Sequence, residues 1–356
     1  MVEFAPDEET RLMLQGLEEF HAAEIQPLGE DHRDLLVPDH RRLAPDGRLT
    51  KEAVELIDTV RRRSGEAGYY GVGLPESVGG TPVGTVGLVR LIRRLYAQGL
   101  GLNMHVIEGA PGPHENLLEL DEDLQAEYLV PTVEGRKSGC FALTEQTSGS
   151  DATAMATTAE RDGDEWVIDG RKMWITNSPY ADYGQVFART PEADGISAFL
   201  FDTDNPGFSV ARINQTLFND GMQAEIDFDD CRVPDAQLIG DPGEGFTLAI
   251  GFLNMGRIRI AARCVGLMAF LLEQAVEYAN DRESWGKPIG KRQHVRGMIA
   301  DIATWKETLE GLVCGRPGKS TRAMTPPSRP PWRSTTAPRS SSRPQTTPSR
   351  YSAPTA

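Results

Sequence analysis

Hydrophobic and polar positions follow three successive patterns along the chain. From residue 8 to residue 130, apolar side chains recur at helical spacing between Gly- and Pro-rich breaks. From about Gly139 the apolar runs become short, rich in β-branched and aromatic residues, and separated by turn signals such as "RDGDE". From Gly245 to residue 312 the helical spacing returns in two long stretches. The order is therefore helices, then strands, then helices.

This order predicts an α+β multidomain fold. Strands do not alternate with helices, so a parallel sheet made of strand–helix–strand units is not expected. We expect four parts, which are an N-terminal all-α domain over 1–135, a middle domain over 136–244 built as an antiparallel β-barrel or sandwich, an incomplete C-terminal helical bundle over 245–313, and a disordered tail over 314–356.

The net charge of −15 conceals two parts of opposite sign. Residues 315–356 carry seven Arg, one Lys and no acidic residue, whereas the first 314 residues carry 29 basic and 52 acidic side chains, a net charge of −23. Because such an acidic surface repels nucleic acid and anionic lipid, we expect neither as a partner. Only six of those 29 basic residues are lysine, which fits adaptation to high salt. An ordinary acidic cytosolic enzyme is the alternative.

Further sequence features narrow the class of protein. No run of about 18 apolar residues is present, and the start "MVEFAPDEET" lacks the basic and apolar regions of an export signal. Four cysteines and six histidines are scattered without metal-ligand spacing. We therefore expect a cytoplasmic protein with neither a disulfide framework nor a metal site.

Four polar or mixed motifs are weak indicators when each is taken alone. "TEQTSGSDATAM" has the composition of a loop at a strand end, and "KMWIT" that of a strand whose tryptophan fills a core. "GRIRIAAR" fits an amphipathic helix, and "DRESWGKPIGKRQ" fits a helix end followed by a loop. Their order along the chain is more informative than any one of them.

In that order, the motifs resemble the acyl-CoA dehydrogenase family. The resemblance covers about residues 10–313 and is strongest from Cys140 to Gln293. It implies helical, β and helical domains, usually assembled as a homotetramer. It also implies FAD as cofactor and an acyl-CoA thioester as substrate. In this family a glutamate takes the α-proton, the β-hydrogen leaves as hydride to flavin N5, and an electron-transfer flavoprotein reoxidises the flavin.

The resemblance also assigns the cofactor-binding residues. Phe141, Leu143 and Thr144 would line the flavin through backbone and hydroxyl groups. Trp174 would pack against the isoalloxazine, and Thr176 would place its hydroxyl near N5. A second set would reach the FAD of the neighbouring subunit, with the first residue as a pyrophosphate partner: Arg282, Ser284, Trp285 and Gln293.

Substrate contacts follow from the same resemblance. Ser150 would touch the thioester-bearing arm of CoA, and Asn254 and Arg257 match positions beside the substrate. The family loop commonly reads Glu-Pro-Gly-x-Gly-Ser-Asp, whereas this chain has "EQTSGSD", so its loop differs in stiffness. Trp285 stands where the family usually has Phe.

The catalytic carboxylate is missing from both family positions. One position lies on the first helix of the last domain and is Gly256 here. The other lies in a C-terminal Tyr-Glu-Gly-Thr-like motif, which this chain lacks, and no carboxylate follows Glu310. Within this sequence, no catalytic residue can therefore be assigned.

Three interpretations of the tail remain open. Its nine Pro and fifteen Ser or Thr among 42 residues fit a disordered linker, and its charge allows a nucleic-acid-binding arm. The third is a frameshift product. Joining the third base of each codon to the first two of the next gives an unambiguous aspartate at Met324–Thr325 and permits an acidic, helix-forming continuation. We favour the frameshift, which predicts a bundle with exposed apolar faces such as "GLMAFLLEQAV", poor folding or weak FAD binding.

Two alternative functions remain open besides that of an acyl-CoA dehydrogenase. An acyl-CoA oxidase, or a related flavin oxidase or monooxygenase, would keep the fold and change the electron acceptor. A non-catalytic subunit would pair with an intact homologue.

Overall fold

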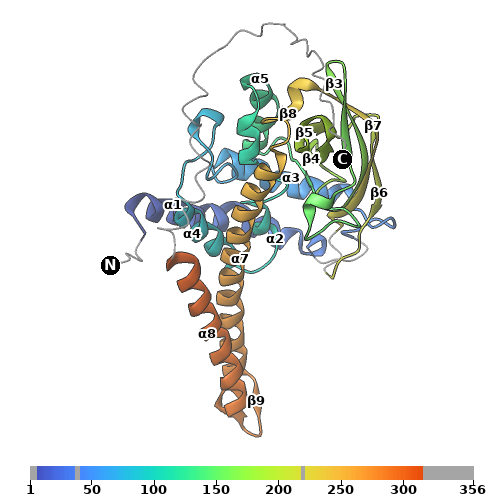
Figure 1. Ribbon diagram of the computed structural model, residues 1–356. Helices are drawn as coiled ribbons and strands as arrows, with labels where there is room; N and C mark the ends of the chain where they lie inside the picture. Colours follow the sequence, from blue (N-terminus) through green and yellow to red (C-terminus); the bar gives the residue numbers. More distant parts are fainter. Residues whose placement is uncertain (1–5, 37–40, 218–220, 316–356) are drawn as a thin grey trace, which may run out of the picture. The chain divides into compact units, whose positions relative to one another are not determined.

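The computed structural model describes residues 6–36, 41–217 and 221–315. The interpretations of the tail beyond Gly315 therefore lie outside the described residues. Helices come first and last along the chain (Figure 1). They are α1(Glu8–Phe20), α2(Gln26–Asp31), α3(Lys51–Glu66), α4(Thr85–Tyr96), α5(Glu122–Leu124), α6(Val130–Val133), α7(Gly245–Asp281) and α8(Gln293–Gly315).

The N-terminal helices form where capping residues precede an apolar stripe. The Asp7 carboxylate accepts a hydrogen bond from the Thr10 amide at 2.7 Å and caps α1. Thr50 caps α3 in the same way, through the Ala53 amide. Helix α4 buries one stripe, and this stripe packs with residues of α1, α3 and α7 in one core: Leu88, Leu91, Ile92 and Leu95. The predicted N-terminal helices are confirmed.

The middle of the chain folds into one eight-stranded sheet with the order β6-β7-β3-β2-β4-β5-β8, and β1 pairs with β4 beside this path. The strands are β1(Phe141–Ala142), β2(Thr158–Asp162), β3(Glu165–Thr176), β4(Tyr183–Thr190), β5(Gly195–Asp202), β6(Phe208–Ile213), β7(Gln223–Pro234) and β8(Leu238–Ile239). Aromatic and aliphatic residues alternate inward along β3 and β7 and fill the core of the sheet.

Of the expected antiparallel barrel or sandwich, the closed barrel is wrong, and so is the purely antiparallel pairing. The sheet is open, because its end strands β6 and β8 do not pair with each other in the described part of the chain. It is also mixed, because β1 and β2 both pair with β4 in parallel. Strands β6 and β8 were not predicted. Alternation in β6 is interrupted by a register shift between Val210 and Arg212, and β8 is only two residues long, so neither gives a clear alternating signal.

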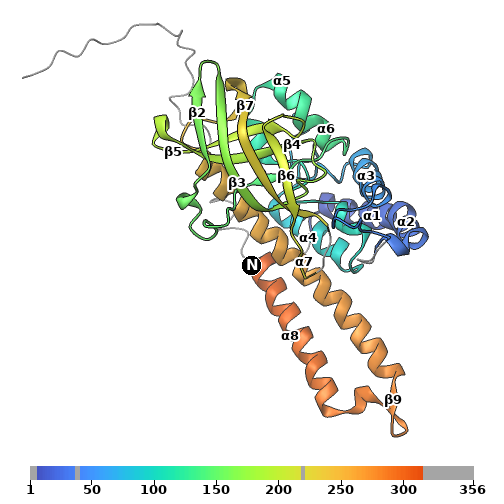
Figure 2. The ribbon, with the colours of Figure 1, turned by 90° about the vertical axis from the view of Figure 1, so that its right-hand side faces the viewer.

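Helix α7 connects the parts of the fold. Its first residue, Gly245, lies so close to β5 that a Cβ there would come 2.4 Å from the Ser197 carbonyl carbon. Farther along, a Cβ at Gly266 would come 2.5 Å from the Arg93 carbonyl oxygen of α4. Only glycine permits these two approaches. Beyond them α7 pairs with α8, and both views show the two helices side by side (Figure 2).

The pair of long helices exposes apolar side chains. Leu271 of the quoted "GLMAFLLEQAV" segment is 54% exposed, and Trp305 on α8 is 60% exposed.

None of the helices in the described residues is both long enough and apolar enough to cross a membrane. The same residues contain no cluster of His, Cys, Asp or Glu able to hold a metal ion. The described residues belong to one compact unit, and the predicted domain boundaries stay a prediction.

Candidate functional site

The short strand β1 continues into a strip of backbone, residues 143–145, that lies against β3. The Met173 amide donates to the Thr144 carbonyl at 2.8 Å. One residue earlier, the Lys172 ammonium donates to the Leu143 carbonyl at 3.2 Å. Two consecutive carbonyls of the strip are therefore held by two consecutive residues of β3. This arrangement brings Leu143 and Thr144 to the strand that carries Trp174 and Thr176.

The strip leaves backbone donors without protein partners. Among the described residues, neither the Leu143 nor the Thr144 amide N–H donates to another backbone or side-chain group, although Leu143 is 7% exposed. A buried N–H without a partner costs free energy, so such groups normally meet water or a ligand. Adjacent unpaired amides fit a planar heterocycle that presents acceptor atoms along one edge.

Trp174 has a strained backbone. Its φ is 62°, in the left-handed region that tryptophan rarely adopts. The irregularity follows from a register shift between Lys172 and Ile175 in the pairing of β3 with β7. As a result Ile175 is buried and Trp174 is 47% exposed. The indole is thus displaced from the core, where its position in the strand alone would have placed it. Such strain persists chiefly at functional sites.

Thr176 ends β3 beside β7. Its hydroxyl donates to the Gln223 side-chain oxygen at 3.1 Å. The next residue, Asn177, is fully buried and also has a positive φ of 70°. Its side chain donates to the Gly139 carbonyl at 2.9 Å and accepts from the Arg61 guanidinium at 3.2 Å. The end of β3 is therefore fixed from both sides.

A buried ion pair supports the strip and was not predicted. Lys172 has no exposed surface, and its ammonium lies 2.8 Å from the Glu145 carboxylate. Burial lowers the pKa of Lys172 to about 8. Burial also raises the pKa of Glu145, but hydrogen bonds from Ala156, Lys172 and Thr157 outweigh it and hold the pKa below its usual value. The sequence indicated that Lys172 is buried, because it lies an even number of residues from the buried Trp166 and Ile168 and so falls on the same face of β3.

Helix α7 meets β1 and His114 through an aromatic stack. The Phe252 ring lies 4.4 Å from the rings of both Phe141 and His114, measured between centroids, with nearly parallel planes. Burial lowers the pKa of His114 to about 4, so the imidazole is neutral near pH 7. Phe141 is thus half-buried under α7, and the first turns of α7 are fixed relative to β1.

The predicted substrate residues follow on α7. Asn254 and the exposed Arg257 are joined by a hydrogen bond between their side chains. Gly256 lies between them, and a Cβ built on it would have no heavy atom within 4 Å. The helix therefore presents open space at the position where some family members carry their base.

Ser150 is exposed in the loop that precedes β2. The loop is anchored on both sides, because the Glu145 amide pairs with the Ser148 carbonyl and the Ser148 hydroxyl donates to the Asp151 carbonyl. Next to this loop lies a hollow of about 430 Å³ with a mixed polar and apolar lining. Its lining includes Thr153, the exposed Arg189 and Phe246 from the first turn of α7.

The other predicted cofactor residues lie at the far end of α7. Arg282 ends the helix, and Ser284 and Trp285 belong to a hairpin made of β9(Glu283–Ser284) and β10(Lys287–Pro288). Trp285 is 90% exposed, with the Arg292 guanidinium 5.1 Å from its ring centroid. Gln293 begins α8 and is exposed. The fold does not bring this group to the strip around Thr144.

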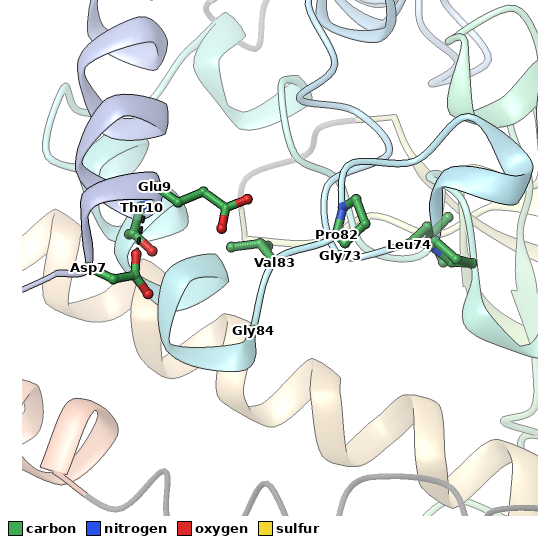
Figure 3. A pocket seen from close by; sticks show the side chains of 9 residues that line it. Asp7, Glu9, Thr10, Gly73, Leu74, Pro82, Val83 and Gly84 are labelled. Carbon is green, nitrogen blue, oxygen red and sulfur yellow. Dashed lines mark hydrogen bonds between the residues drawn. The ribbon is translucent and has the colours of Figure 1, made fainter.

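A separate hollow near the N-terminus carries no comparable chemistry. It has about 430 Å³ and lies between the start of α1 and the loop from Gly73 to Gly84 (Figure 3). Of its charged lining residues, Asp7 is engaged in capping α1, as the dashed bond to Thr10 shows, and the Glu9 side chain extends from α1 towards Val83. The hollow shares no residue with the strip, β3 or α7, so the candidate site is the one around Thr144 and Trp174.

Comparison with known proteins identifies the family. The model of the acyl-CoA dehydrogenase middle domain matches residues 140–231, and that of the acyl-CoA dehydrogenase C-terminal domain matches residues 243–314. An acyl-CoA dehydrogenase of Bacillus subtilis is 34% identical over 281 residues, which cover 77% of this chain and 73% of the relative. The chain belongs to the acyl-CoA dehydrogenase family, whose members are FAD-dependent oxidoreductases.

A further relative and two solved structures are also similar to this chain. The mitochondrial short-chain specific acyl-CoA dehydrogenase of Rattus norvegicus is 35% identical over 253 residues; the chain spans 60% of its length. A structure titled electron transferring flavoprotein of Acidaminococcus fermentans matches with a TM-score of 0.76 and 31% identity, covering 90% of this chain and 81% of that one. A glutaryl-CoA dehydrogenase from Mycobacterium smegmatis in complex with FADH2 matches with a TM-score of 0.75 and 25% identity, covering 90% and 78%.

Proposed function

We propose that this chain is an FAD-dependent acyl-CoA dehydrogenase by descent, acting on the α and β carbons of an acyl-CoA thioester in the cytoplasm. The observation that carries the proposal is the strip of unpaired amides at Leu143 and Thr144, next to the strained and half-exposed Trp174. Two backbone N–H donors without partners, beside an indole that projects from its strand, would fit a flat ring system with acceptor atoms along one edge.

The residues of the strip fit the FAD group. The amides of Leu143 and Thr144 would bind the acceptor edge of the ring, and Trp174 would cover one of its faces. The Thr176 hydroxyl donates to the Gln223 side-chain oxygen and can turn from it to a ligand. When bound, FAD supplies the acceptor for the substrate hydride. The chain's own part is to orient the ring and to exclude water from it.

The hollow beside the Ser150 loop supports an acyl-CoA substrate. Arg189 is exposed there and can bind a phosphate group, and Phe246 offers an apolar surface. Phe246 lies on the same helix as a predicted substrate contact, because it precedes Asn254 by about two helical turns. We propose that the CoA arm follows this hollow towards the open space at Gly256.

The hairpin at the end of α7 favours an oligomer. Between Asn254 and Arg282 the helix rises by roughly 42 Å at 1.5 Å per residue. One chain therefore cannot place Arg282, Trp285 and its own strip around a single FAD. We propose that the hairpin reaches the cofactor of a neighbouring copy in a homotetramer, and that an electron-transfer flavoprotein accepts the electrons.

A second proposal is that this chain lacks the proton-abstraction step. Gly256 provides no carboxylate, although the space beside it is open. The chain would then bind FAD and acyl-CoA and turn over slowly, or would serve as a non-catalytic partner of an intact homologue. Among active alternatives, an acyl-CoA oxidase keeps the same site and passes electrons to oxygen.

One experiment separates these proposals. The purified chain is loaded with FAD and mixed anaerobically with butyryl-CoA, while the visible flavin absorbance is followed. We expect a rapid shift of the flavin spectrum on binding and a slow loss of absorbance. Added electron-transfer flavoprotein or oxygen then shows which acceptor is reduced. A chain that takes up no FAD even from excess cofactor would overturn the proposed function.

A further inference from the structure

The Lys172–Glu145 pair joins three segments of the candidate site. Lys172 lies on β3, two residues before Trp174. Glu145 ends the strip, and its carboxylate accepts hydrogen bonds from the Ala156 amide at 2.6 Å and from the Thr157 amide and hydroxyl at 3.0 and 2.6 Å. The pair therefore ties β3 to the strip and to the far end of the loop that carries Ser150.

Both members of the pair are saturated with partners. The Lys172 ammonium donates to the Glu145 carboxylate, to the Leu143 carbonyl and, at 3.8 Å, to the Met155 sulfur. Three donors thus meet three acceptors, which is the full capacity of an ammonium group. Because buried ion pairs are often no more stabilising than apolar side chains of similar volume, stability alone does not account for this one.

The geometry of the peptide bond supplies a reason. In a trans peptide, the carbonyl of one residue and the N–H of the next point in opposite directions. Lys172 holds the Leu143 carbonyl on the inner side of the strip, and the Thr144 N–H is thereby directed away from the interior. A charged donor on the carbonyl also polarises the same peptide and strengthens its N–H as a donor.

We propose that Lys172 is a positioning residue for the flavin, which it serves by holding the Leu143–Thr144 peptide so that the Thr144 N–H faces the cofactor. Glu145 keeps the ammonium in place and prevents an unpaired buried cation. The inference rests on the proposed function, because it assumes that the strip binds FAD. It assigns to the Lys172–Glu145 pair a role in the affinity for FAD and in the midpoint potential of the flavin, in addition to its role in folding.

The test separates positioning from stability with three variants of the full chain. Lys172→Met removes the donor and leaves Glu145 buried without its cation. The double variant Lys172→Met/Glu145→Gln removes both charges, so that folding stability recovers while the Leu143 carbonyl stays unheld. Met155→Leu is the matched control, because it removes the ammonium's contact with sulfur and leaves its hydrogen bond to the Leu143 carbonyl in place. The readouts are the melting temperature, the FAD dissociation constant from quenching of flavin fluorescence, and the midpoint potential of the bound flavin.

We expect both Lys172 variants to bind FAD roughly 10- to 100-fold more weakly, as loss of a charge-assisted hydrogen bond predicts, and with an altered midpoint potential. The control should bind FAD as the unmodified chain does. A double variant that regains stability and binds FAD with unchanged affinity and potential would overturn the inference and leave the proposed function standing. Failure of the unmodified chain to bind FAD would overturn both.

Discussion

Replacing Gly256 with glutamate should place a general base at the position on α7 where some family members carry theirs. The ideal Cβ at this position has no heavy atom within 4 Å, and the residue lies inside α7 with helical geometry. Removing a glycine from a helix interior stabilises by about 0.5–1 kcal/mol, so Gly256→Glu should fold at least as well as the unmodified chain. The new side chain would enter the open space that we assign to the acyl group.

The expected gain in rate is large enough to measure. A positioned general base contributes about 10²- to 10⁴-fold, so flavin reduction by butyryl-CoA should accelerate by at least roughly 100-fold in Gly256→Glu. Gly256→Gln is the matched control, since glutamine has nearly the same shape and helix propensity but cannot take the proton. Stopped-flow absorbance under anaerobic conditions measures both rates. Equal rates in the two variants, with equal affinities for FAD and butyryl-CoA, would refute the placement of the acyl group beside Gly256.

Three further outcomes are expected. Glu108→Gln should destabilise the fold by up to about 3–5 kcal/mol, because it removes the buried carboxylate 2.7 Å from Arg61, which is 2% exposed, and leaves that cation only the more exposed Asp58 at 3.1 Å. Burial raises the pKa of Glu108, but Arg61 and His105 outweigh it and lower the pKa from 4.5 to about 2. The stability difference from the unmodified chain, measured by urea unfolding, should therefore be complete above about pH 5 and shrink as the pH falls towards 2; a pH-independent difference would contradict this. Trp174→Gly should relieve the positive φ, leaving the melting temperature of the cofactor-free protein unchanged or higher while weakening FAD binding; a loss of stability typical of a core tryptophan would argue against it. The melting temperature should rise from low to multimolar KCl if the net −23 of the first 314 residues reflects adaptation to salt, and a constant value would exclude that adaptation.

The sequence alone was sufficient for most of the long helices and strands and for the family. The helices over α1, α3, α4, α7 and α8 follow from apolar spacing, with capping residues at α1 and α3, and β4 and β7 follow from β-rich composition and turn signals. These are local properties, decided by residues a few positions apart. The order of the motifs from Cys140 to Gln293 indicated the family, which the comparisons confirm.

The tertiary structure decided what depends on distant pairing. Whether the sheet closes, and that β1 and β2 pair with β4 in parallel, cannot be inferred from strands considered singly. Simple alternation along β3 would place Trp174 on the buried face, and only the register shift against β7 turns it outward. The partners of Lys172 lie 27 and 29 residues away along the chain, and the hydrogen bonds that direct the strip exist only when those segments meet. Local sequence sets the elements because backbone propensity is short-ranged, whereas the site depends on buried polar groups that find their partners across the fold.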